Sequence, residues 1–169
     1  MENIPERKKL IEEVVMLRDH FIHLFKYNDW ATRAAANSIS GLEKKDERLG
    51  ELLSHLVSAQ QLWLNRVLGR EIVVNPWEKH TVQESIAQST TVSAEWVNLL
   101  ESHSDKDLDN RVEYKNTKGE SYSNAVRDII IQAINHSTYH RAQIAQRVKA
   151  LGSKPAVTDY IVYQRQFQK

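Results

Sequence analysis

The chain has 169 residues, a formal net charge of +1, 27% charged residues and no cysteine. This length fits a single domain, residues 1–169, that can bury a hydrophobic core without disulfides. The near-neutral charge argues against nucleic-acid binding, and the lack of cysteine excludes thiolate metal sites and a cysteine nucleophile. The polar N-terminus has no signal-peptide core, and no run approaches the roughly 20 apolar residues of a membrane span. We therefore expect a soluble, cytoplasmic protein with no membrane partner.

Residues 9–40 have the apolar periodicity of a long amphipathic helix that ends at Gly41. By 3.6-residue counting, His20 and Asn28 fall on its inner face, whereas His23 faces solvent. His20 is either a further site residue or, as we prefer, a hydrogen-bonded core histidine. Asn28 needs partners if it is buried, so it either braces a site or links two helices.

Residues 49–68 form the second predicted helix. His55 lies directly on its apolar stripe, and Arg66 follows on the same stripe three turns later. A single histidine at such a position is typically a hydrogen-bonded core residue. His55 therefore points to a site only if another helix supplies matching histidines. The loop that follows, residues 70–80, is expected to expose His80.

The pattern Thr81-x-x-Glu84 is a capping box and predicts the start of a third helix that extends to about residue 104. Two serines in its buried stripe favour close helix contact over a pocket. Residues 108–122 carry a weak β-hairpin signal and could equally form an ordered loop. Residues 154–169 are expected to form a short helix on the bundle or on a second subunit.

The fourth predicted helix, residues 123–151, carries the most informative motif, with Ser123 as the expected N-cap. His136 and His140 are four residues apart, which places their Cβ atoms about 5–6 Å from each other on one side of a helix. Both imidazoles could bind one metal ion at about 2.0–2.1 Å. The pair alone is better explained by two hydrogen-bonded histidines at the core edge, and a third ligand on a facing helix would reverse that preference.

Four amphipathic helices predict an all-α fold, a four-helix bundle with a hairpin before the last long helix. If the second and fourth helices face each other, His55, His136 and His140 can converge. Three imidazoles leave at least one coordination position open, as in catalytic rather than structural zinc sites. We expect a divalent metal, zinc or nickel, with iron or manganese as alternatives; imidazole also suits copper.

Three segments together resemble the DinB/YfiT-like family: residues 27–31 (YNDWA), residues 53–56 (LSHL) with the later Trp63, and residues 135–144 (NHSTYHRAQI). The resemblance spans nearly the whole chain. It implies a right-handed four-helix bundle, often a homodimer, in which His55, His136 and His140 hold a divalent metal. Some relatives transfer low-molecular-weight thiols to electrophiles, some isomerise substrates through a thiol adduct, and many have no assigned activity.

Our first functional hypothesis is a metal-dependent enzyme of the thiol transferase or hydrolase type. A bound metal would lower the pKa of a coordinated thiol or water, and a thiol would have to come from a small-molecule cosubstrate because the chain has no cysteine. The candidates for contacts around the metal or to the substrate are Asn28, Arg66, Tyr139 and Arg141, each of which could instead have a packing or surface role.

The alternative is a non-catalytic bundle that is stabilised by metal or binds a small ligand, since no acid/base carboxylate lies beside the histidines in the sequence. A third reading treats the histidines as core residues without metal. A homodimer is expected, with Trp77 and Tyr163 as exposed aromatic residues suited to an interface.

Overall fold

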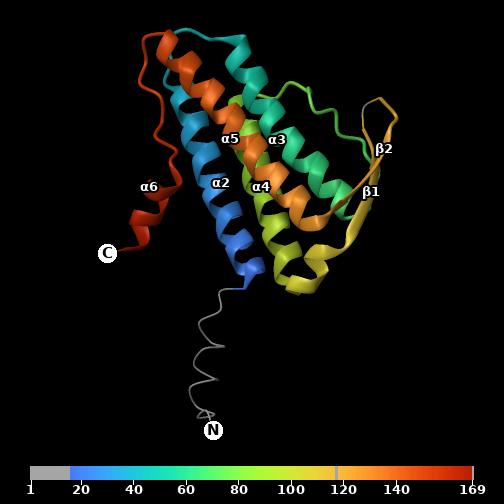
Figure 1. Cartoon of the computed structure of the whole chain (residues 1–169). Helices are drawn as coiled ribbons and strands as arrows, with labels where there is room; N and C mark the ends of the chain where they lie inside the picture. The colour runs from blue at the N-terminus through green and yellow to red at the C-terminus, as the bar shows by residue number, and fades with distance from the viewer. Residues whose placement is uncertain (1–15, 117, 169) are drawn as a thin grey trace.

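Four long helices form the body of the molecule (Figure 1). The computed structural model describes residues 16–116 and 118–168, and these helices are α2 (Leu17–Ser40), α3 (Glu47–Val67), α4 (Val82–Glu101) and α5 (Val126–Ala150). The bounds of α3, α4 and α5 lie within three residues of the predicted ones. α2 ends where predicted, and its predicted start at residue 9 lies outside the described residues. The predicted four-helix bundle is confirmed.

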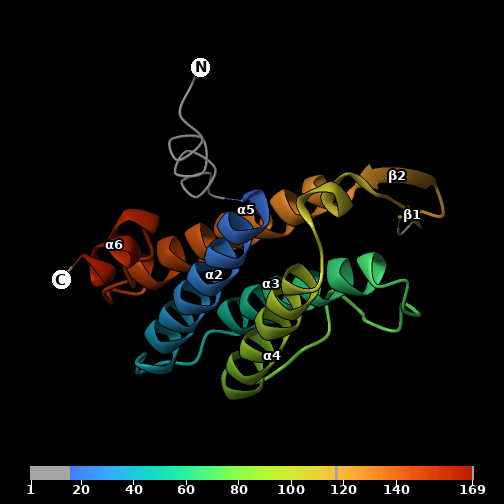
Figure 2. The same ribbon diagram turned by 90° about the horizontal axis from the view of Figure 1, so that it is seen from below.

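The helices are arranged so that α3 packs against α4 and α5, and α2 packs against the same two helices. The loop of residues 68–81 crosses back along the bundle, so α3 and α4 run in the same direction and α5 runs antiparallel to α3 (Figures 1 and 2). The second and fourth predicted helices are therefore neighbours, which is the condition that a shared histidine site requires.

Side-chain caps begin α3 and α4. The Asp46 carboxylate accepts a hydrogen bond from the Leu49 N–H at 3.1 Å. The predicted capping box at Thr81 is present, with its side chain bonded to the Glu84 N–H and the Glu84 carboxylate bonded back to the Thr81 N–H. His80, just before this cap, is half-buried, whereas we predicted it to be exposed. Its backbone N–H donates a hydrogen bond to Ser54 Oγ of α3 at 3.0 Å, which keeps the residue against that helix.

The predicted hairpin is present as β1 (Arg111–Lys115) and β2 (Ser121–Ala125), an antiparallel pair in which Tyr114 lies opposite Tyr122. The prediction of Ser123 as a helix cap was wrong, because pairing with β1 keeps this residue in an extended strand. The N-cap of α5 is Ala125, which offers no side-chain acceptor.

The core lies between the four helices. Phe25 and Trp96 are fully buried and stack with ring centroids 4.8 Å apart. Close contact rather than a pocket explains Ser89 of α4, whose Oγ donates to Asp29 Oδ1 on α2 at 3.1 Å. The placement of His20 on the inner face was wrong, because His20 is exposed. The buried face of α2 begins at the next residue, Phe21, and continues through Phe25 in the following turn.

The C-terminal segment folds back onto α2 as the short helix α6 (Tyr160–Gln164), followed by the 3₁₀ turn η2 (Arg165–Phe167) (Figure 1). The aromatic rings of Tyr163 and His23 lie 5.4 Å apart. Two expectations were therefore wrong: His23 is half-covered instead of facing solvent, and Tyr163 is 7% exposed and unsuited to an interface. Among the described residues, none of the helices combines the length and the hydropathy that a membrane span requires.

Candidate metal centre

Three histidines meet between α3 and α5. His55 projects from α3, and His136 and His140 project from one side of α5. Each offers a ring nitrogen, and these three atoms all lie within 4.8 Å of one another. The Nε2 atoms of His55 and His136 are 3.2 Å apart. Two nitrogens bound to one ion at about 2.0–2.1 Å stand at about this separation.

The loop after α3 fixes the ring of His55. The carbonyl oxygen of Pro76 lies 2.7 Å from His55 Nδ1, so Nδ1 carries the proton and donates it. The Trp77 indole stacks against the imidazole of His55, with ring centroids 3.7 Å apart and an interplanar angle of 12°. His55 is thus held in the tautomer whose Nε2 lone pair faces the other two histidines.

A side chain of α5 does the same for His140. The amide oxygen of Gln143 lies 3.0 Å from His140 Nδ1 and accepts its N–H. The spacing of three residues places Gln143 on the same side of the helix as His140, where it is half-buried. His140 therefore also presents an unprotonated Nε2 to the cluster.

Burial keeps the cluster uncharged. The pKa of His136 is lowered to about 4, first by burial and then by the neighbouring His140 and His55. Burial likewise lowers the pKa of His55 and of His140. At neutral pH all three rings are neutral imidazoles, the form in which histidine binds metal.

These residues fit a divalent cation. His55 Nε2 carries a lone pair and lies 3.2 Å from His136 Nε2. Either a proton on His136 or a shared cation must therefore lie between the two nitrogens. The hydrogen-bonded orientation of His55 and His140 is the arrangement that usually supports metal-ligating histidines. An all-nitrogen set of three donors suits zinc, nickel, iron or copper and leaves open positions for a further ligand.

An open pocket of about 440 Å³ adjoins the cluster. Its wall contains His55 and His136 at one end and Arg66 with aromatic residues at the other. The apolar residues Ala59 and Leu62 lie along α3 between them. This volume is in the range of small-ligand pockets.

The model of the DinB family matches residues 16–168. The chain belongs to the DinB family. It is 21% identical over 165 residues to the protein DinB of Bacillus subtilis strain 168, covering 87% of this chain and 95% of that protein. The fold is similar to that of a DinB-like protein from Bacillus cereus ATCC 10987, with a TM-score of 0.61, 20% identity, and coverage of 81% of this chain and 95% of that one. A DinB-like protein of Bacillus subtilis, YjoA, gives a TM-score of 0.56 at 18% identity, over 82% of this chain and 95% of that one.

The other candidate residues of this DinB-family chain divide into two groups. Arg66 lines the pocket beside the histidines, and Tyr139, although 61% exposed, has its ring centroid 5.1 Å from that of His140. Asn28 and Arg141 instead contact each other between α2 and α5, with Arg141 Nη1 donating to Asn28 Oδ1 at 2.5 Å. Asn28 therefore links two helices, which was one of its two predicted roles.

Sequence reasoning missed three supporting groups of the site: Gln143, the Pro76 carbonyl and the Trp77 ring. The spacing of His140 and Gln143 was a usable signal, since residues three apart meet on a helix. No sequence signal identifies which carbonyl of a loop will lie over a histidine.

Proposed function

We propose that this DinB-family protein binds a divalent metal through His55, His136 and His140 and catalyses a metal-dependent reaction of the thiol transfer type. The observation that supports the proposal most is the convergence of three ring nitrogens within 4.8 Å, with two of the rings fixed by Nδ1 hydrogen bonds. Zinc and nickel suit three imidazoles well, with iron or manganese as alternatives.

The reaction type follows from what the surrounding residues supply. A bound divalent cation would lower the pKa of a thiol or water in an open position and provide a nucleophile near neutral pH. His55 and His140 hold no exchangeable proton toward that position, because their protons lie on Nδ1, and the adjoining pocket of about 440 Å³ offers room for a small substrate. The thiol must belong to a low-molecular-weight cosubstrate, because the chain has no cysteine.

Thiol transfer suits this pocket better than hydrolysis. Hydrolysis commonly needs a general acid or base for proton transfer to the leaving group. No aspartate or glutamate is among the described residues that line the pocket. A divalent cation held by His55, His136 and His140 would lower the pKa of a thiol, so that the thiol would lose its proton to solvent without a protein base. With an electrophile whose displaced group leaves as a stable anion, the reaction would need no protein acid either.

The same lack of a carboxylate supports a second candidate, a non-catalytic bundle in which the metal stabilises the fold or orients a small ligand. This candidate predicts a higher melting temperature with metal, because metal binds the folded state preferentially. It also predicts no turnover of any thiol and electrophile pair.

Metal content and turnover of untagged protein separate these functions. We expect about one equivalent of zinc or nickel per chain, and turnover of thiols with model electrophiles that stops when a chelator removes the metal. His136→Ala should lose both. His20→Ala, which changes an exposed histidine away from the cluster, should lose neither. Turnover that survives metal removal would contradict the enzymatic proposal, and stabilisation without turnover would favour the second candidate.

We also propose that the protein is a homodimer. The support is the set of large apolar side chains that the fold leaves exposed, among them Trp77 at 53% and Ile131 at 46% exposure. Light scattering after size-exclusion chromatography measures the mass directly, and a mass near the chain's 19.6 kDa would contradict the proposal.

A further inference from the structure

The pocket next to the histidines has two chemically different ends on one face of α3. His55, Ala59, Leu62 and Arg66 follow each other at spacings of four, three and four residues, the repeat of one helical stripe. Eleven residues separate His55 from Arg66, which places their Cα atoms about 16 Å apart along the helix axis. The metal-binding end and the arginine end are thus joined by an apolar floor.

Aromatic rings hold the Arg66 guanidinium at its end of the pocket. Its central carbon lies 4.4 Å from the ring centroid of Trp63 and 4.5 Å from that of Tyr114. The two rings are nearly perpendicular, at 84°, so the guanidinium lies in the angle between them. Cation–π contacts of this kind restrain an arginine without neutralising it.

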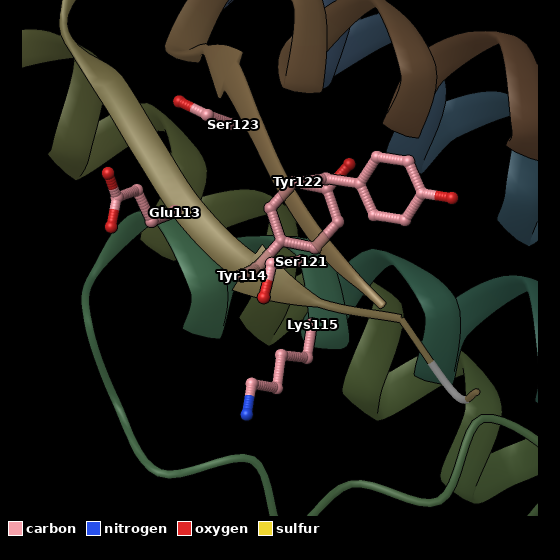
Figure 3. Close-up of a pocket in the computed structure, with 6 residues that line it drawn as sticks. All are labelled: Glu113, Tyr114, Lys115, Ser121, Tyr122 and Ser123. Atoms are coloured by element: carbon pink, nitrogen blue, oxygen red, sulfur yellow. The ribbon is translucent and has the colours of Figure 1, made fainter. Parts of the chain in front are cut away.

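The hairpin supplies part of this support. Tyr114 of β1 and Tyr122 of β2 are cross-strand partners with ring centroids 6.1 Å apart, and both project from the strands shown in Figure 3. The carbonyl oxygen of Lys115 accepts a hydrogen bond from Arg66 Nη2 at 3.0 Å. The hairpin therefore fixes the guanidinium from one side and leaves its other edge toward the pocket that Arg66 lines.

The charge of Arg66 has no counterion in the described part of the chain. Among residues 16–116 and 118–168 no carboxylate forms a salt bridge with it, and its Nε is buried without a hydrogen-bond acceptor. Burial also lowers the pKa of its guanidinium. Nη2 is bonded to the Lys115 carbonyl and Nε is buried, so Nη1 is the guanidinium nitrogen that has no partner among the described residues and is not buried. A half-buried cation with such a donor at the end of a pocket is suited to bind an anion.

We propose that Arg66 is the anion-binding residue of this pocket, and that the substrate is an elongated small molecule with a metal-binding group at one end and a carboxylate or similar anion at the other. This inference rests on the proposed metal site for the first of these groups. The apolar floor between the ends accommodates a chain of methylene groups or an equivalent spacer.

Probe molecules of defined length and charge test the proposal. In cobalt-loaded protein, the thiolate absorption band would report the binding of mercaptooctanoate, its neutral match mercaptooctanol, and mercaptoacetate, which is too short to span both ends. We expect Arg66→Gln to weaken mercaptooctanoate binding about tenfold, the effect of losing a hydrogen bond to a charged group. Mercaptooctanol and mercaptoacetate should bind the variant as they bind the wild type.

Two further variants complete the test. Arg66→Lys retains the charge and should recover part of the mercaptooctanoate affinity. Arg70→Gln removes a cation that pairs with Glu95 outside the pocket and should change no affinity. Melting midpoints of all variants show whether the fold is kept. Equal mercaptooctanoate affinity in the wild type and a folded Arg66→Gln variant would overturn the proposal, as would an equal loss for mercaptooctanol.

A metal-free arm separates this inference from the proposed function. Octanoate and octanol lack a metal-binding thiol, so calorimetric titration of the metal-free protein measures the arginine end alone. Weaker octanoate binding in Arg66→Gln would support the anion site even if cobalt did not bind. If cobalt binds but Arg66→Gln leaves octanoate and mercaptooctanoate unaffected, the metal site stands and the anion site is refuted.

Discussion

Substitution of Gln143 is the most specific test of how the metal centre is oriented. Its amide oxygen accepts the Nδ1–H of His140 at 3.0 Å, whereas the equivalent support of His55 comes from a backbone carbonyl that no side-chain substitution removes. Without the acceptor, His140 can rotate and can move its proton to Nε2, which blocks the ligand nitrogen. Loss of such a support typically lowers metal affinity about 10- to 100-fold, or about 1.4–2.8 kcal/mol.

The assay is a zinc titration in competition with a chromophoric chelator. We expect Gln143→Ala to weaken zinc by that factor and Gln143→Glu, which keeps an acceptor and adds negative charge, to retain or increase affinity. Gln146→Ala, one turn later and exposed, is the matched control and should bind zinc as the wild type does. Unchanged affinity in a folded Gln143→Ala variant would refute the idea that this hydrogen bond orients His140 for a metal.

Three further predictions concern Trp77 in the loop after α3, the buried contact of Arg141, and the stability of the protein at low pH. Nickel or cobalt should quench tryptophan fluorescence in the wild type, and much less in Trp77→Phe, because this indole stacks on His55 at 3.7 Å; equal quenching in both would contradict the stacked geometry. Asn28→Ala should lower the free energy of unfolding in urea by about 2 kcal/mol, since it removes the acceptor 2.5 Å from the buried Arg141 guanidinium, while metal stoichiometry stays at the wild-type value. Metal-free protein should lose stability as the pH falls from 6.5 toward 4, because unfolding restores the ordinary pKa of His136 from its lowered value of about 4 and the unfolded chain takes up the proton first. The loss should be smaller in His136→Gln, and an equally steep loss there would assign the acid sensitivity to other groups.

The sequence predicted the helices and the histidine set because both depend on local spacing. His136 and His140 lie one turn apart on one helix. His55 lies on the apolar stripe of a second helix, and such a stripe must pack against another helix to be buried. The side of α2 that faces the core was harder to predict. His20 is next to the buried Phe21, and the difference of one residue is a rotation of about 100° around the helix.

Other parts of the structure depend on contacts between distant segments. Tyr163 is buried because the tail returns to α2, and its phenol meets Tyr27 at a centroid distance of 5.7 Å. Pro76 reaches His55 because the loop after α3 crosses the bundle toward α4. Ser123 suits a helix cap by residue type, and strand pairing overrides that preference. The periodicity of one segment does not indicate which distant segment it will contact.

X-ray absorption at the zinc edge of the loaded, untagged protein would show whether α3 and α5 share one metal ion. We expect three imidazole nitrogens at about 2.0–2.1 Å, and a loss of one nitrogen donor or of the metal itself in His55→Ala and in His136→Ala. A first shell with fewer than three imidazoles, or one that His55→Ala leaves unchanged, would contradict a metal centre shared by α3 and α5.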